Sequence, residues 1–292
     1  MSKTEGSSKS MQLVAIALIM LCVGVAVGYS YGQSQIPPPK PATTVTVTAT
    51  PSKRVTLLEK ITQRGYVIVG TSADYPPYES IDPNSKKIVG LDVDITEAIA
   101  RELNIAVKWE DMPFESLIGA LEAGKVDIIN AGIGLKAERM AKLAYSIPYQ
   151  ESSTNVLVVK DDSSVKPFTD LAEVGKLKLK IGVQTGTIQE GIISDLVKEG
   201  KVEKANMISY INVDLMMTDL NTGRIDTAMI DKPVADSWAK RIAIRIVYFE
   251  WAPPKCLWLL KGERELLDAI DTALLKLHKN GTIQELLNKW LG

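Results

Sequence analysis

Two residues of opposite charge stand at positions that favour the binding of a small polar molecule. Arg139 follows a glycine-rich segment, residues 127–134, and opens a short predicted helix. Its planar guanidinium group can bind a carboxylate through two parallel hydrogen bonds, which a lysine cannot do. Asp231 ends the predicted strand 227–230, and a carboxylate at the C-terminal edge of such a strand faces the crevice of an α/β protein. Together they offer one cation and one anion to a ligand.

Each of these residues also has a plainer interpretation. Arg139 on a solvated helix face would bind nothing. Asp231 can instead cap the helix that begins near Pro233, a role compatible with ligand binding. Gly132 and Gly134 favour the first interpretation of Arg139, because glycines allow a close backbone approach and N–H donors near a helix N-terminus attract anions.

Composition excludes several other kinds of chemistry. The 292 residues carry 34 Lys and Arg against 35 Asp and Glu, so the net charge of −1 gives no electrostatic case for nucleic-acid binding. One histidine (His278) and two cysteines (Cys22 and Cys256) are too few for a zinc site built from Cys and His or for a disulfide framework. We expect no cofactor and no metal ion.

The elements that must position the charged residues alternate between strands and helices. Predicted strands cover residues 66–70, 106–109, 127–130, 155–159, 180–183, 227–230 and 242–248. Predicted helices include residues 94–103, 115–123, 263–279 and 282–290. This alternation is typical of an α/β protein with mainly parallel sheets.

An internal repeat suggests two lobes of similar construction. The segment 121–128 (LEAGKVDI) recurs 99 residues later as 220–227 (LNTGRIDT). Both copies indicate the end of a helix, a glycine in the left-handed conformation and a return into a buried strand. Two similar lobes leave a cleft between them, and clefts between domains are common ligand sites.

Several ordered motifs resemble one protein family. Residues 90–103 (GLDVDITEAIAREL) match the signature of the solute-binding proteins that deliver polar amino acids to ABC importers. Further similar segments occur in family order: residues 70–79 (GTSADYPPYE), 127–139 (DIINAGIGLKAER), 182–187 (GVQTGT), 223–231 (GRIDTAMID) and the C-terminal 280–290. The similarity covers residues 55–292. It implies a fold of the type II periplasmic-binding-protein class, with two α/β lobes joined by two crossings around a ligand cleft.

The resemblance also implies roles for individual residues. Arg139 would bind the carboxylate of a free amino acid, and Asp231 its ammonium group. Tyr75 would stack on the ligand's side chain and Phe114 would form an apolar wall, although either ring is equally compatible with the core. Thr187 would reach the carboxylate from the second lobe or serve only as a helix N-cap.

Departures from the family pattern bear on specificity. Gly134 stands where many members have Ser or Thr, so one side-chain donor is missing. Ser72 stands where binders of cationic amino acids tend to have an acid, and Gln184 is a further uncharged pocket position. We therefore expect an uncharged amino acid as the ligand, an expectation weakened if the neighbouring Asp74 takes the place of Ser72.

The N-terminal region predicts export and a tether. Leu13 to Gly28 is an apolar run of 16 residues preceded by Lys3 and Lys9. This run nearly spans a hydrocarbon layer about 30 Å thick, and the preceding charges orient the rest of the chain to the outside. Residues 1–10 would be cytoplasmic, 11–31 a signal peptide or, as we favour, a retained anchor, and 32–52 a Pro/Thr-rich linker. Such a stalk resembles the tethered surface proteins of archaea.

The predicted architecture assigns residues 53–149 plus 255–292 to the first lobe and 154–250 to the second. The crossings should lie near residues 149–153 and 251–255, where Pro253 and Pro254 enforce an extended path. We expect a monomer that binds a free amino acid, meets an ABC permease at the membrane and binds no nucleic acid.

The sequence leaves two alternatives open. An enzyme on the same fold, similar to cyclohexadienyl or arogenate dehydratase, would need a general acid from Glu79 or Glu151. A ligand-sensing receptor lobe is the other alternative, although a single apolar segment and no kinase or channel sequence argue against signalling by this chain alone.

Overall fold

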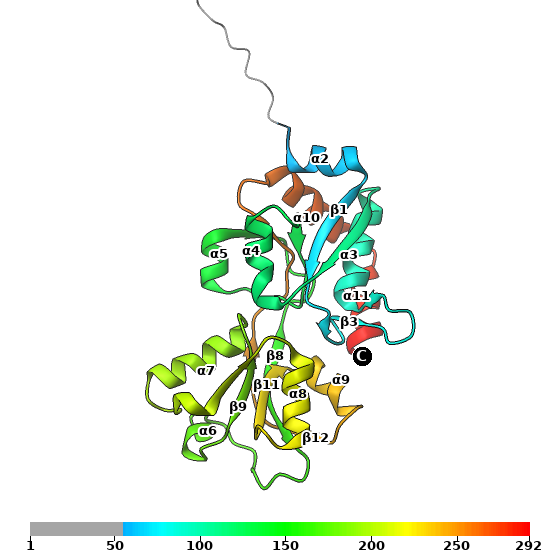
Figure 1. Ribbon diagram of the computed structural model, residues 1–292. Coiled ribbons are helices and arrows are strands. Elements are labelled where there is room, and N and C mark those ends of the chain that lie inside the picture. Colours follow the sequence, from blue (N-terminus) through cyan, green and yellow to red (C-terminus); the bar gives the residue numbers. More distant parts are fainter. Residues whose placement is uncertain (1–54) are drawn as a thin grey trace, which may run out of the picture. The chain divides into compact units, whose positions relative to one another are not determined.

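The computed structural model describes residues 55–292, which form one compact unit (Figure 1). The predicted cytoplasmic N-terminus (1–10), anchor (11–31) and linker (32–52) therefore lie outside the described residues. Within residues 55–292, no helix is both long and apolar enough to cross a membrane.

The first lobe is built on a five-stranded sheet with the order β5-β1-β6-β13-β7. Its strands are β1 (Tyr66–Thr71), β5 (Ala106–Asp111), β6 (Ile128–Ile129), β7 (Leu143–Tyr145) and β13 (Trp258–Leu260). Its helices are α2 (Leu57–Arg64), α3 (Leu91–Glu102), α4 (Leu117–Glu122), α5 (Ala137–Lys142), α10 (Arg264–Lys279) and α11 (Thr282–Leu291), with the 3-10 helix η1 (Phe114–Ser116). A small sheet of β2 (Asp74–Tyr75), β3 (Glu79–Ile81) and β4 (Ile88–Val89) completes it.

The second lobe repeats this plan with the order β10-β9-β11-β8-β12. Its strands are β8 (Ser153–Lys160), β9 (Ile181–Gln184), β10 (Met207–Tyr210), β11 (Thr227–Asp231) and β12 (Ile244–Ala252). Its helices are α6 (Glu173–Lys176), α7 (Ile188–Lys198), α8 (Val213–Thr222) and α9 (Lys232–Ala239), with the 3-10 helix η2 (Lys204–Asn206). Figure 1 shows the helices packed around each sheet.

One strand in each sheet runs against the other four. In the first sheet it is β13, which pairs antiparallel with β6 and β7. In the second it is β8, which pairs antiparallel with β11 and β12. Each of them is the strand that the chain enters directly after crossing from the other lobe. The predicted α/β class with mainly parallel sheets is confirmed, and the two reversed strands are a feature that the alternation of elements did not predict.

The internal repeat has the same structural role in both lobes. Gly124 and Gly223 end their helices with positive φ angles of 67° and 76°, the left-handed conformation that glycine tolerates best. The aspartates three residues further on are also equivalent. Asp127 Oδ2 accepts the backbone N–H of Ile68 at 2.6 Å, and Asp226 Oδ2 accepts that of Lys180 at 2.7 Å. Each aspartate thus joins its strand to the neighbouring one.

The two crossings run beside each other between the lobes. One leads from β7 to β8 and the other from β12 to β13. Lys255 in the second crossing donates its backbone N–H to the carbonyl of Gln150 at 3.0 Å, and it also forms a bridge with Gly134. The segment around Lys255 is therefore held on both sides by the first lobe and the first crossing.

Candidate ligand-binding site

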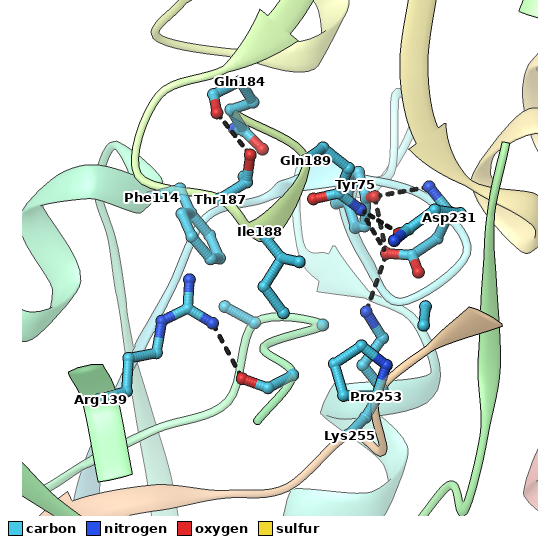
Figure 2. Close-up of a pocket in the computed structure, with 15 residues that line it drawn as sticks. Tyr75, Phe114, Arg139, Gln184, Thr187, Ile188, Gln189, Asp231, Pro253 and Lys255 are labelled. Carbon is cyan, nitrogen blue, oxygen red and sulfur yellow. Dashed lines mark hydrogen bonds and ion pairs between the residues drawn. The ribbon is translucent and has the colours of Figure 1, made fainter. Parts of the chain in front are cut away.

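A pocket lies where the crossings and the two sheets meet (Figure 2). It takes residues from both lobes and from the second crossing. They are Tyr75, Phe114, Ala131, Gly132, Gly134, Arg139, Asn155, Gln184, Thr187, Ile188, Gln189, Asp231, Ala252, Pro253 and Lys255. The structure thus brings together all of the predicted site residues except Ser72.

Arg139 lies at one end of the pocket as a buried cation. Its side chain extends from α5 and the residue is 5% exposed. Nη1 donates to the carbonyl of Gly134 and Nη2 to that of Gly186, each at 2.9 Å, so the guanidinium bonds to both lobes. It also lies 5.5 Å from the centre of the Phe114 ring. Burial lowers the pKa of Arg139 to about 10, against the raising effect of Glu138.

No carboxylate forms an ion pair with Arg139 among residues 55–292. The two carbonyls and the aromatic ring supply only partial negative charge. A buried cation without a counter-ion is costly. Its energy falls when an anion enters the pocket, so this end of the site is suited to a carboxylate.

Asp231 lies at the other end and is fully paired (Figure 2). It ends β11 and stands at the N-cap position of α9, without a capping hydrogen bond from its side chain. Its Oδ2 accepts the hydroxyl of Tyr75 and the ammonium group of Lys255, both at 2.8 Å. Its Oδ1 accepts the hydroxyl of Ser153 at 3.0 Å. The carboxylate therefore belongs to an ion pair within the protein.

Lys255 is the main pocket residue that sequence reasoning missed. It is 3% exposed and its Nζ lies 5.5 Å from the centre of the Tyr78 ring. The only sequence signal was a lysine directly after the two prolines of the expected crossing. Further lining residues were also not predicted: Ala131, Asn155, Ile188, Gln189, Ala252 and Pro253. These six further residues carry neutral side chains, so Lys255 is the one charged group that was missed.

The glycine-rich segment behaves differently from the expectation of open N–H donors. The N–H of Gly132 is already bonded, because it donates to Asp92 Oδ2 at 2.6 Å. Burial raises the pKa of Asp92 to about 6, against the lowering effect of that hydrogen bond. Gly132 adopts a φ of 55°, and a Cβ there would lie 3.1 Å from the Tyr75 ring. Its glycine is thus required by the backbone and by close packing on Tyr75.

Thr187 and Gln184 line the second-lobe wall. Thr187 caps α7, because its hydroxyl accepts the N–H of Glu190 at 3.1 Å and donates to the carbonyl of Gln184 at 2.6 Å. The helix-cap interpretation of Thr187 therefore holds, and the residue also lines the pocket. Gln184 directs its amide group to Asp74 of the first lobe at 2.9 Å.

Ser72 does not reach the pocket. Its hydroxyl donates to Asp74 Oδ1 at 2.7 Å. Asp74 in turn accepts the backbone N–H of Val213 at 2.7 Å, at the start of α8 in the second lobe. Burial raises the pKa of Asp74 to about 6. The first loop thus supplies no acid to the pocket wall, and Asp74 links the two lobes outside it.

The general acids required by the enzyme alternative are also absent from the pocket wall. Glu79 is fully buried beside Asp92, and burial raises its pKa well above the ordinary value. Glu151 is exposed. Neither lines the pocket, whose only carboxyl group among the described residues is that of Asp231.

The comparison with known families agrees with this geometry. The family of bacterial extracellular solute-binding proteins, family 3, matches residues 67–292. The chain belongs to this family. The resemblance inferred from the motifs is confirmed, and so is the two-lobed fold.

Individual relatives of this solute-binding protein are named for the binding of amino acids. The present chain is 32% identical to the arginine-binding extracellular protein ArtP of Bacillus subtilis, over 77% of this chain and 85% of ArtP. It is 28% identical to the L-cystine-binding protein TcyJ of Escherichia coli, over 81% of this chain and 86% of TcyJ.

A solved structure extends the comparison to the fold. The ancestral amino acid-binding protein AncCDT-1, a precursor of cyclohexadienyl dehydratase, matches with a TM-score of 0.72 and 30% identity, covering 81% of this chain and all of AncCDT-1. These relatives are binding proteins, so the prediction of a binder and not an enzyme is confirmed.

Proposed function

We propose that this solute-binding protein captures a free amino acid outside the cytoplasm and delivers it to the permease of an ABC importer. The observation that carries the proposal is Arg139, a buried cation whose only polar contacts within residues 55–292 are two carbonyls. A ligand carboxylate would supply the missing charge through the two-bond geometry that guanidinium favours. Because Arg139 bonds to both lobes, the same ligand would favour the closed arrangement.

We further propose that the ligand's side chain is uncharged. The charged lining residues are Arg139, Lys255 and Asp231, two cations and one anion. A zwitterionic amino acid adds no net charge, whereas a cationic side chain adds a second positive charge with no acid at the pocket wall to balance it. The arginine named in some relatives is therefore a poorer fit here.

Calorimetric titration of the full-length protein in detergent with the twenty amino acids tests both proposals. We expect an uncharged amino acid to bind more tightly than arginine or lysine, and to be recovered chemically unchanged. Tightest binding of arginine would contradict the uncharged side chain. Absence of binding by every amino acid would contradict the function itself.

The membrane tether is a separate proposal that rests on the apolar run after Lys9. We propose that residues 11–31 remain attached and hold a monomeric binding unit at the outer surface of the membrane. Fractionation of cells that express the full-length chain should recover it in membranes at full size. Recovery only as a shorter soluble species would contradict the anchor and leave export intact.

A further inference from the structure

We propose that Lys255 is a specificity-determining residue that takes the place of the ligand's ammonium group at Asp231. The inference rests on the proposed function. It predicts that the site recognises the ligand's carboxylate and depends little on its amine. Amino acids would then share the site with their 2-hydroxy and 2-oxo acid counterparts, which carry the same carboxylate and no ammonium group.

The ion pair of Lys255 and Asp231 lies inside the pocket wall. Nζ of Lys255 is 2.8 Å from Oδ2 of Asp231, and the two side chains are 4% and 2% exposed. The lysine backbone cannot move freely, because the second crossing is bonded to Gln150 and bridged to Gly134. The buried position of the Lys255 side chain is therefore fixed by the backbone of the second crossing.

Most of the acceptor positions of Asp231 are already taken. Oδ2 receives Tyr75 and Lys255, with the amide of Gln189 further away at 3.5 Å. Oδ1 receives Ser153. A carboxylate offers about four acceptor positions. A ligand ammonium group must therefore displace a donor or take the position left on Oδ1, on the same carboxylate that Lys255 already binds.

Either route places two positive charges beside one buried carboxylate. Like charges a few ångströms apart repel strongly in a site from which water is excluded. Two other buried carboxyl groups, Asp92 and Glu79, lie close enough to Lys255 for its charge to act on them. Neither lines the pocket, so neither can receive the ligand's amine. A hydroxyl or carbonyl in the amine's position avoids this repulsion.

The opposite end of the pocket shows why the carboxylate stays essential. Arg139 has no carboxylate partner among the described residues, whereas Asp231 has Lys255. The charge that the pocket lacks is thus a single negative one. A monoanionic acid supplies it without adding a cation, and this defines the ligand class that we infer.

Matched pairs of ligands test the inference directly. We would titrate the full-length protein with L-alanine and L-lactate, L-leucine and L-2-hydroxyisocaproate, and L-phenylalanine and L-phenyllactate. Loss of an ammonium group that is paired with a buried carboxylate ordinarily weakens binding by roughly 30-fold or more. For the wild type we expect the hydroxy acid to bind within about tenfold of its amino acid.

Two variants remove the charge of Lys255. Lys255→Gln keeps a donor for Asp231 and Lys255→Met removes it, so a folding defect in the second does not prevent the test by the first. In each we expect the preference for the amino acid over the hydroxy acid to rise by at least tenfold. The control is Lys261→Met, because Lys261 is exposed and donates only to the carbonyl of Ala141. It should keep the wild-type preference.

The outcomes separate this inference from the proposed function. A preference that changes less than tenfold in Lys255→Gln overturns the role of Lys255, even if amino acids bind well. Binding of hydroxy acids with no binding of any amino acid supports the role of Lys255 and contradicts the proposed function. Absence of binding by both classes overturns both.

Discussion

The two ends of the pocket are both buried but differ in how their charges are balanced. Arg139 is bonded to two carbonyls and packs beside Phe114, with no carboxylate partner among residues 55–292. Asp231 has an ion pair and two hydroxyl donors from its own chain. The first end can gain a full charge from a ligand, whereas the second has already gained one from Lys255.

This difference changes the expected contributions of Arg139 and Asp231 to ligand binding. A partner offsets part of the desolvation cost of a buried charge, whereas an unpaired buried charge bears the whole cost until a ligand compensates it. The family resemblance implies equal roles for Arg139 and Asp231. Their surroundings predict instead that Arg139 dominates the affinity and that the Asp231 end adjusts the specificity. Four experiments test this contrast.

The largest effect should come from Arg139→Ala. Removing one partner of a buried, hydrogen-bonded charge pair costs about 2–5 kcal/mol, or roughly 30- to 4000-fold in affinity. Arg139→Lys should restore only part of it, because an ammonium group cannot form the planar two-bond contact. Isothermal titration measures the loss, and a melting curve checks the fold. An affinity for Arg139→Ala within threefold of the wild type would place the carboxylate elsewhere.

A pH-dependent effect is expected at Asp74, which joins the lobes beside the pocket. Its pKa in the folded protein is about 6, above the ordinary value of 3.8. The folded state therefore holds a proton that the unfolded chain releases. This stabilisation is complete below about pH 4 and is lost as the pH rises through 6.

The variant Asp74→Asn cannot release a proton at this position, so it should not lose this stability as the pH rises. Relative to the wild type, its free energy of unfolding should rise by up to about 3 kcal/mol between pH 4 and pH 7.5. Urea unfolding at the two pH values measures the change. Asp82→Asn is the control, because the Ser85 N–H lowers the pKa of Asp82, so the effect of this variant on stability falls below about pH 4 and should change little between pH 4 and pH 7.5. A pH-independent difference for Asp74→Asn would mean that the lobes do not bury this carboxylate in solution.

Tyr75→Phe tests the contact that connects the lobes at the Asp231 end. The Tyr75 hydroxyl donates to the Asp231 carboxylate and accepts its backbone N–H at 3.0 Å. Its loss leaves a buried donor unpaired, which costs about 1–3 kcal/mol, or roughly 5- to 150-fold in affinity if closure is required for binding.

The control for Tyr75→Phe is Tyr78→Phe. The Tyr78 hydroxyl donates to Gln150 in the first crossing and not to Asp231. Its removal should leave the affinity within about fivefold of the wild type. Equal losses in the two variants, measured by calorimetry, would contradict a special role for the contact between Tyr75 and Asp231.

The smallest effect should come from Ser72→Ala. Because Ser72 donates to Asp74 and does not line the pocket, the order of preference among amino acids should not change. The lost hydrogen bond should lower the free energy of unfolding by about 0.5–1.5 kcal/mol. A titration panel with the variant checks the first expectation. A changed order of preference would restore the role in specificity that the family pattern implies for Ser72.

Much of the fold and most of the pocket were predictable because their signals are local. Helix and strand periodicity located the main elements, and the repeated LEAGKVDI pattern located two glycine caps with the same role in the two lobes. The motifs around Tyr75, Arg139 and Asp231 each lie in one short segment at the end of an element. Because each motif is contiguous in the sequence, these three residues could be named from their resemblance to the family's motifs, without coordinates.

Only the tertiary structure decided which groups the pocket offers to a ligand. Tyr75 and Asp231 are 156 residues apart, and no sequence period relates either of them to Lys255. The Gly132 N–H is taken by Asp92, which lies 40 residues away on α3. The reversed strands β8 and β13 arise where the crossings return the chain to a sheet. A sequence determines which charges are present, but their balance depends on which long-range neighbours folding brings into contact, because the interaction between two charges depends on their distance and their burial.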